Sequence, residues 1–134
     1  MTSALHTSTV SGSVGEATAA LRHGLESRGI ELFAVIDHGA GALSAGLQLG
    51  DEVVVIFGNP ALGTHLMQDV RELGLELPLR ILLWDDHGLT KATYTDPHVY
   101  TERFGLKNSD SFLDVMGSLL KSLVVELGAD PEQA

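Results

Sequence analysis

The chain has 134 residues, 44% hydrophobic and 19% charged, which is typical of one globular domain and not of a disordered chain. Eight Lys and Arg against 18 Asp and Glu give a formal net charge of −10, which argues against binding to nucleic acid or anionic lipid. Cysteine is absent, so disulfides, thiol nucleophiles and cysteine metal sites are excluded. Met1–Val10 does not resemble a secretory segment and no run of about 18 apolar residues occurs, so we expect a cytoplasmic protein without a membrane span.

The first third of the chain predicts strand, helix, strand. Ser3–Val10 alternates weakly and is expected to form an edge strand. Ser13 and Glu16 have the spacing of a capping box, and apolar residues then recur at helical spacing, which predicts a helix over Val14–Arg28. Ile30–Asp37 is nearly apolar on both faces, so we expect an inner strand.

The middle of the chain predicts a second buried strand between two helices. A short helix is expected over Ala42–Leu47, and Glu52–Phe57 has the pattern of a buried strand. Asn59 followed by Pro60 is typical of a helix start, because Asn caps free N–H groups and Pro suits the first helical position. The apolar stripe of this helix continues to Gly74.

The last third of the chain predicts a hairpin and two helices. The expected elements are strands Leu79–Trp84 and Leu89–Thr95 around the four-residue loop 85–88, a short helix from Asp96-Pro97 to Gly105, and a long amphipathic helix over Ser109–Leu127. Residues 129–134 are expected to fray.

This order of elements, β-α-β-(α)-β-α-β-β-α-α, favours one α+β domain over residues 1–134. Three strands come late and close together, with a hairpin among them. We therefore expect a mostly antiparallel sheet with helices packed on one face, followed by the C-terminal amphipathic helix over 109–128.

Three segments together resemble the domain-of-unknown-function 302 family. They are Val35-Ile36-Asp37-His38, Phe57-Gly58-Asn59-Pro60 followed by Gly63-Thr64-His65-Leu66-Met67, and Leu77-Pro78-Leu79-Arg80. The resemblance covers Ser11 to Leu106 and implies a fold like that of TATA-binding protein and a homodimer, but no activity. His65 stands where the family often has proline, so the helix start could instead be Thr64, and His65 receives no family role.

Asp37 and His38 are the first candidate site, because they end a strand and precede a glycine-rich turn. His38 could carry a proton or bind a metal, with Asp37 orienting an imidazole. The alternative is structural: Asp37 caps the following turn and His38 bonds to the backbone.

The segment Gly58–Thr64 is the second candidate site, because it joins a strand to a helix. Free N–H groups at a helix start can hold an anion or a carboxylate, and the side chains of Asn59 and Thr64 could add hydrogen bonds. The alternative is a structural corner in which both side chains cap the helix. In that case, replacing either by Ala should cost about 1 kcal/mol.

Three further side chains are candidate ligand contacts. Met67 lies on the helix after the corner, and Trp84 and Tyr94 lie on the hairpin with Arg80. If the hairpin side chains share one face they could line a pocket; otherwise they pack under the helices. The six histidines show no helical metal spacing, and a metal site would need His38 and His65 brought together, so we expect no metal and no cofactor.

These features favour a non-enzymatic binding module. We expect a homodimer that holds a small apolar or anionic ligand near Asp37, His38, Asn59 and Thr64. Two alternatives stay open. One is a structural or interaction protein without a small-molecule site, and the other is a small enzyme using His38 as general acid and base.

Overall fold

A five-stranded antiparallel sheet with strand order β1-β5-β4-β3-β2 organises the protein, whose computed structural model describes residues 4–134. The elements are β1 (Leu5–Val10), α1 (Val14–Ser27), β2 (Glu31–Asp37), α2 (His38–Ser44), β3 (Glu52–Gly58), α3 (Pro60–Asp69), the 3-10 helix η1 (Arg71–Leu75), β4 (Leu79–Asp86), β5 (Leu89–Thr95), α4 (Val99–Phe104) and α5 (Asp110–Glu126). Every strand pairing is antiparallel, so the predicted α+β class is confirmed.

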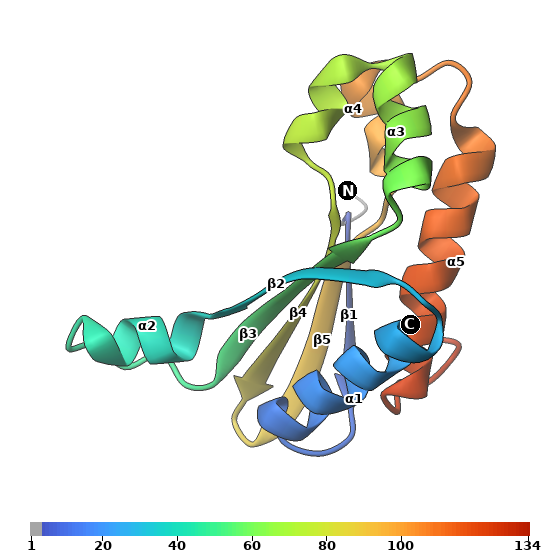
Figure 1. Cartoon of the computed structure of the whole chain (residues 1–134). Coiled ribbons are helices and arrows are strands. Elements are labelled where there is room, and N and C mark those ends of the chain that lie inside the picture. The colour runs from blue at the N-terminus through green and yellow to red at the C-terminus, as the bar shows by residue number, and fades with distance from the viewer. Residues whose placement is uncertain (1–3) are drawn as a thin grey trace.

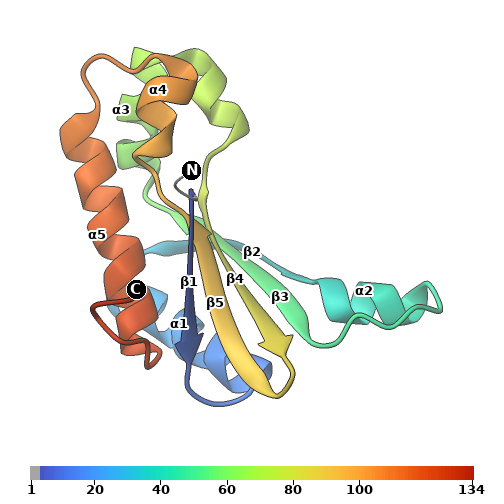
Figure 2. The same ribbon diagram turned by 180° about the vertical axis from the view of Figure 1, so that it is seen from behind.

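The helices divide into three groups around the sheet (Figures 1 and 2). Helices α1 and α5 lie against one face, α3, η1 and α4 lie beyond one end of the strands, and α2 extends away from the body. Strand residues alternate accordingly: Val55, Phe57, Ile81 and Leu83 are fully buried, and the residues between them are less buried. The core therefore lies between this face and the two long helices.

The start of α1 is the predicted capping box. The Ser13 hydroxyl accepts the backbone N–H of Glu16 at 3.1 Å, and the Glu16 carboxylate accepts the N–H of Ser13 at 3.1 Å. The hydrogen bonds from Ser13, first from its backbone and then from its side chain, lower the pKa of Glu16. The helix then buries Leu21 and Leu25 in the core, as its apolar spacing predicts.

The prediction that 30–37 forms an inner strand is wrong, because β2 lies at the edge of the sheet and pairs with β3 alone among the described strands. Three of its apolar side chains are exposed: Phe33 by 47%, Val35 by 37% and Ile36 by 45%. An apolar strand is usually buried on both faces. Here the apolar residues instead leave a hydrophobic edge on the surface of the chain.

Two local boundaries also differ from the expectations. The short helix begins at His38 and not at Ala42, because Asp37 caps it directly at the end of β2. The hairpin strands extend to Asp86 and Leu89, which leaves a two-residue loop, His87-Gly88, with φ angles of 52° and 93°. A two-residue loop needs positive φ angles at both positions to match the right-handed twist of the hairpin, whereas a longer loop does not.

The chain end after α5 lies against the body, where fraying was expected. Ala129 is 4% exposed, and the Ser8 hydroxyl on β1 donates to the carbonyl of Gln133 at 3.3 Å. The N–H of Ser11 donates to the carbonyl of Leu127 at 2.9 Å, which ties the end of α5 to the turn after β1. Among residues 4–134, no helix is long and apolar enough to cross a membrane.

Candidate functional site

The corner Gly58–Thr64 begins α3 at the first of the two predicted positions. Asn59 is the N-cap, its side-chain oxygen accepts the N–H groups of Ala61 at 2.9 Å and Leu62 at 3.4 Å, and Pro60 is the first helical residue. The alternative start at Thr64 is therefore wrong. Thr64 is not a cap either: its hydroxyl donates to the carbonyl of Pro60 at 2.6 Å, one helical turn back.

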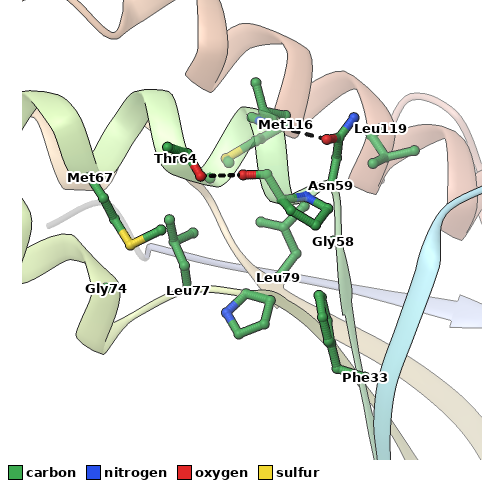
Figure 3. Close-up of a pocket in the computed structure, with 14 residues that line it drawn as sticks. Phe33, Gly58, Asn59, Thr64, Met67, Gly74, Leu77, Leu79, Met116 and Leu119 are labelled. Carbon is green, nitrogen blue, oxygen red and sulfur yellow. Dashed lines mark hydrogen bonds between the residues drawn. The ribbon is translucent and has the colours of Figure 1, made fainter.

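A cavity of about 270 Å³ opens beside this corner, between α3, α5, β2 and the start of β4 (Figure 3). We call it the corner cavity. Its lining consists of Phe33, Gly58, Asn59, Pro60, Leu62, Gly63, Thr64, Met67, Gly74, Leu77, Pro78, Leu79, Met116 and Leu119. The walls are thus almost wholly apolar, and among the described lining residues only Asn59 and Thr64 carry side-chain polar groups other than the thioethers. Helix α3 ends at Asp69, before the predicted end at Gly74, and η1 continues the wall.

Glycines give the corner cavity its shape. A Cβ atom at Gly58 would lie 3.3 Å from Cβ of Pro78, which is closer than most such contacts, so Gly58 lets the end of β3 and the start of β4 approach each other. A Cβ atom at Gly63 would lie 3.7 Å from Leu77 and 3.9 Å from Met67, at ordinary contact distance. The absence of a side chain at Gly63 therefore leaves space that a methyl group would occupy.

Most polar side-chain groups at the corner already form hydrogen bonds within the protein. The Asn59 oxygen and the Thr64 hydroxyl proton are engaged in α3, whereas the Asn59 amide nitrogen makes no hydrogen bond to another described residue. None of the described lining residues is titratable. One amide group is thus available to a ligand, and no charged side chain is.

Asp37 and His38 lie at the opposite end of the β2–β3 pair from Asn59. Asp37 pairs with Val53, six residues before Asn59 along β3, a separation of about 20 Å at ~3.3 Å per residue. The Asp37 carboxylate accepts the N–H of Ala40 at 2.8 Å and so caps α2, as the structural alternative predicted. His38 is exposed and lines a separate open hollow of about 630 Å³, so the structure does not bring it to the corner cavity.

The three hairpin candidates do not share one face. Trp84 pairs with Lys91 on the face opposite the long helices, and its indole N–H donates to the Thr93 hydroxyl at 3.0 Å. Arg80 has the same parity as Trp84 on β4, whereas Tyr94 points to the helix face and stacks on His6 with ring centroids 5.0 Å apart. Neither Trp84 nor Tyr94 lines the corner cavity, whereas the third predicted contact, Met67, does.

The two histidines that a metal site would require are separated. His65 lies on α3 and stacks on Phe112 of α5, with centroids 4.7 Å apart, whereas His38 starts α2 at the far end of β2. Within residues 4–134, no group of three or more His, Asp or Glu side chains is arranged to hold a metal ion.

Seven lining residues were absent from the sequence-based candidates: Phe33, Gly74, Leu77, Pro78, Leu79, Met116 and Leu119. Phe33 comes from an irregularity in the β2–β3 pairing, and Met116 and Leu119 come from α5. The helical spacing of α5 predicts that these two residues lie on its apolar face. No local signal shows that this face meets α3, which ends more than forty residues before α5 begins.

The fold and the cavity together define a small α+β domain with an apolar cavity at a strand-to-helix corner. The chain belongs to the DUF302 family, described as a domain of unknown function, whose match covers residues 6–123 and therefore includes most of α5. A solved structure of an uncharacterized conserved DUF302 protein from Bacillus stearothermophilus has the same fold: the TM-score is 0.85 at 16% identity, over 94% of this chain and 99% of the other.

Similar sequence also occurs inside longer proteins. The chain is 44% identical over 95 residues to proteins named "Fluoride-specific ion channel FluC 1" from Brucella suis biovar 1 (strain 1330) and from Brucella abortus biovar 1 (strain 9-941). The match covers 70% of this chain but only 37% and 35% of those proteins. The matched segment thus spans little more than a third of these relatives.

Proposed function

We propose that this domain is a binding module that holds a small apolar ligand in the corner cavity. The observation that carries the proposal is the composition of the walls: seven large apolar side chains (one Phe, four Leu and two Met) surround a space of about 270 Å³. This volume lies just below the usual range for ligand sites, so it suits a ligand of a few carbon atoms or one small ring. Burial of such a ligand would be driven by the hydrophobic effect.

The side chains of Met67 and Met116 support an apolar and adaptable site. Methionine has several rotatable bonds and a polarizable sulfur, so it can adjust to ligands of different outline and can contact aromatic rings. The Met67 sulfur would lie 3.1 Å from a Cβ atom at Gly74, so this side chain already rests on the η1 backbone. A single amide donor, that of Asn59, would then orient the ligand.

An anionic ligand receives less support. The first N–H groups of α3 are bonded to the Asn59 side chain, so this helix start does not offer the free donors that anions prefer. Neither Lys nor Arg lines the cavity among the described residues, and the net charge of the chain is −10. The alternative of an enzyme using His38 has no support from this cavity, because His38 lies at the other end of β2.

Ligand binding can be tested by thermal unfolding and calorimetry with toluene, indole and sodium octanoate as probes. A ligand that binds only the folded state at 100 times its Kd stabilises that state by about 2.7 kcal/mol. We expect toluene or indole to raise the Tm. If octanoate alone raises the Tm, the anionic alternative is favoured. If no probe raises the Tm at saturation, the proposal is contradicted.

A matched pair of variants shows whether the probe occupies the corner cavity. Gly63→Leu places a side chain between Leu77 and Met67 and should abolish binding. Gly41→Leu makes the same change in α2, where a Cβ atom would have no described atom within 4 Å apart from its own helix backbone and chain neighbours, and should leave the affinity unchanged. Equal affinities for the two variants would place the probe elsewhere.

The Brucella relatives support a modular role, because similar sequence makes up little more than a third of each. The name of these relatives raises fluoride as a ligand, but the described side chains of the cavity offer a small anion one amide donor, that of Asn59. Sodium fluoride compared with sodium chloride at equal ionic strength is therefore a useful further arm of the thermal assay. We expect the two salts to give the same Tm.

We also propose that the domain forms a homodimer through its β2 edge and α2. The exposed large apolar side chains of this region are Phe33, Val35, Ile36, Leu43, Leu47 and Leu49. A second copy is the natural occupant, because a two-fold axis beside an edge strand pairs that strand antiparallel with itself. Light scattering should give twice the monomer mass, and Ile36→Lys with Leu43→Asp should give the monomer mass. A monomeric parent protein at micromolar concentration would contradict the dimer.

A further inference from the structure

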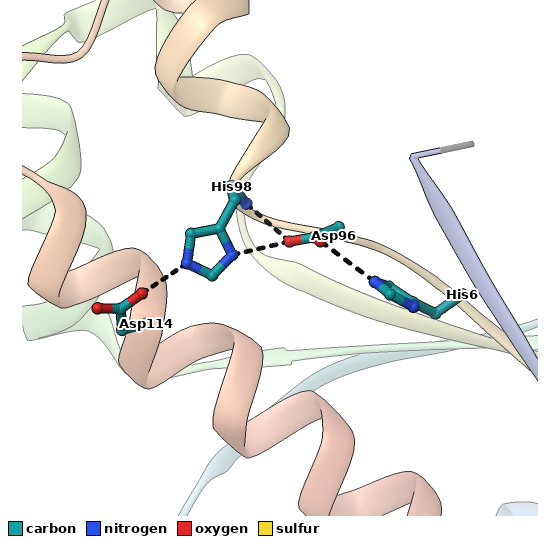
Figure 4. Close-up of polar contacts among 4 residues, drawn as sticks. All are labelled: His6, Asp96, His98 and Asp114. Atoms are coloured by element: carbon teal, nitrogen blue, oxygen red, sulfur yellow. Dashed lines mark hydrogen bonds and ion pairs between the residues drawn. The ribbon is translucent and has the colours of Figure 1, made fainter. Parts of the chain in front are cut away.

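Four side chains form a continuous polar chain that connects β1, the junction between β5 and α4, and α5 (Figure 4). His6 on β1 lies 3.2 Å from one oxygen of Asp96, which follows β5. The other Asp96 oxygen lies 2.9 Å from Nδ1 of His98, and Nε2 of His98 lies 2.6 Å from the Asp114 carboxylate on α5. The imidazole of His98 therefore bridges the junction between β5 and α4 to the first half of α5.

Local structure fixes the position of His98. The backbone N–H of Asp96 donates to the carbonyl of Ala4 at 2.7 Å, and the Asp96 carboxylate accepts the backbone N–H of His98 at 3.0 Å. Opposite the ring, a Cβ atom at Gly117 would lie 3.4 Å from Cε1 of His98. Gly117 and Asp114 are one helical turn apart, so α5 offers the ring a bare backbone beside a carboxylate.

The charges around the ring favour its protonated form. The groups that face it are Asp96 from the β5–α4 junction and Asp114 from α5, and His6 on β1 faces the far oxygen of Asp96. A neutral imidazole has one N–H and could donate to only one of the two carboxylates, whereas an imidazolium donates to both. The hydrogen bonds with Asp114 and then Asp96 raise the pKa of His98.

We propose that His98 is a pH-dependent clasp, which holds the first half of α5 to the β5–α4 junction when the ring is protonated and loosens when the proton is lost. Met116 and Leu119 lie on the same helix and line the corner cavity. Loosening of α5 would therefore also weaken ligand binding, a consequence that rests on the proposed function.

The direction of the pH effect on stability follows from the raised pKa of His98. Because the folded pKa of His98 is raised above its ordinary value of 6.5, the clasp contributes its full stability below that value. The contribution is lost as pH rises through the folded pKa. The His98 side chain is 49% exposed and that of Asp114 is 71% exposed, so the effect is modest and weakens at high salt.

The clasp can be tested on the whole chain at low salt by NMR titration and by hydrogen exchange. We expect His98 to titrate above 6.5 and Asp114→Asn to lower its midpoint. At pH 6, the amides over 110–117 should exchange several-fold faster in Asp114→Asn than in the parent protein. This difference should shrink by roughly half or more at pH 8.5, because the parent protein has then lost the charged contact as well.

His87→Asn is the matched control. His87 pairs with its neighbour Asp86 at 2.9 Å, and this contact likewise raises its pKa, but its side chain is 98% exposed on the hairpin tip and bridges no distant elements. This variant should leave exchange in α5 unchanged at both pH values. A His98 midpoint at or below 6.5, or equal exchange in the parent protein and Asp114→Asn at pH 6, would overturn the clasp.

The link to the cavity is measured separately by the affinity for toluene at pH 6 and pH 8.5. We expect the affinity of the parent protein to fall at the higher pH and that of Asp114→Asn to change less. Unchanged affinity in the parent protein would overturn the link while leaving the clasp in place. If toluene does not bind at all, the proposed function fails, and the clasp is still decided by the titration and exchange results.

Discussion

The two strand-to-helix corners of this protein have similar local chemistry and very different surroundings. At the end of β2, the Asp37 carboxylate caps α2 by accepting an N–H at 2.8 Å. At the end of β3, the Asn59 side chain caps α3 by accepting an N–H at 2.9 Å. Both helices therefore begin where a short polar side chain can bond to the first turn.

The two corners differ in how their helices pack against the rest of the protein. Helix α3 lies against η1 and α5, and its Leu66 is fully buried. Helix α2 extends away from the body in both views, and its Leu43 is 69% exposed. The comparison teaches that a cap determines where a helix begins, whereas elements from elsewhere in the chain determine whether a cavity forms beside it.

Truncation of one leucine in each helix should give the largest difference. Leu66→Ala removes a buried side chain and should cost about 2–5 kcal/mol of unfolding free energy, because the space it leaves closes only in part. Leu43→Ala should change the unfolding free energy by less than about 0.5 kcal/mol in the monomer. Urea unfolding of both variants measures the difference.

Protein concentration is the control in this experiment. If α2 lies in the proposed dimer interface, Leu43→Ala should destabilise the protein only where the parent protein is dimeric. A large cost of Leu43→Ala that does not depend on concentration would show that α2 is buried within one chain, and the contrast between the corners would then be wrong.

Removal of the caps should have intermediate and similar effects at the two corners. Asp37→Ala and Asn59→Ala should each cost about 1 kcal/mol, since each leaves N–H groups of a helix start without a side-chain acceptor. Thr64→Ala should cost less, because its hydroxyl donates to a helix carbonyl that already lies inside α3. Thermal unfolding compares the three variants. A cost for Thr64→Ala equal to that of Asn59→Ala would restore the capping role that the sequence suggested.

The starts of α1 and α3 could be predicted from the sequence because capping is local, whereas the start of α2 at His38 was missed although Asp37 caps it in the same way. Ser13 with Glu16, and Asn59 with Pro60, act through bonds that span three residues or fewer. The faces of the hairpin strands could also be predicted locally. A loop of two or of four residues pairs even-numbered positions of β4 with odd-numbered positions of β5, and paired residues lie on the same face of the sheet. Trp84 and Tyr94, both even-numbered, therefore face opposite sides with either loop length.

The edge position of β2 and the walls of the cavity could not be predicted in this way. Apolar side chains on Phe33, Val35 and Ile36 are compatible with an inner strand and with an exposed edge, because the sequence pattern does not specify the neighbour. Met116 reaches the cavity through the packing of α5 on α3, which joins segments more than forty residues apart.

Replacement of one glycine in each helix should give the smallest effect on stability and the sharpest contrast in binding. Gly63→Ala and Gly41→Ala each place alanine inside a helix, which should add about 0.5–1 kcal/mol to the unfolding free energy. At Gly63 the new methyl group would lie 3.7 Å from Leu77 and 3.9 Å from Met67, and it would occupy part of the corner cavity. At Gly41 an added methyl group would have no described atom within 4 Å apart from its own helix backbone and chain neighbours, so only the backbone effect is expected. Calorimetry with toluene should therefore show weaker binding for Gly63→Ala alone, whereas equal binding by two equally stabilised variants would mean that the ligand does not use the space beside Gly63.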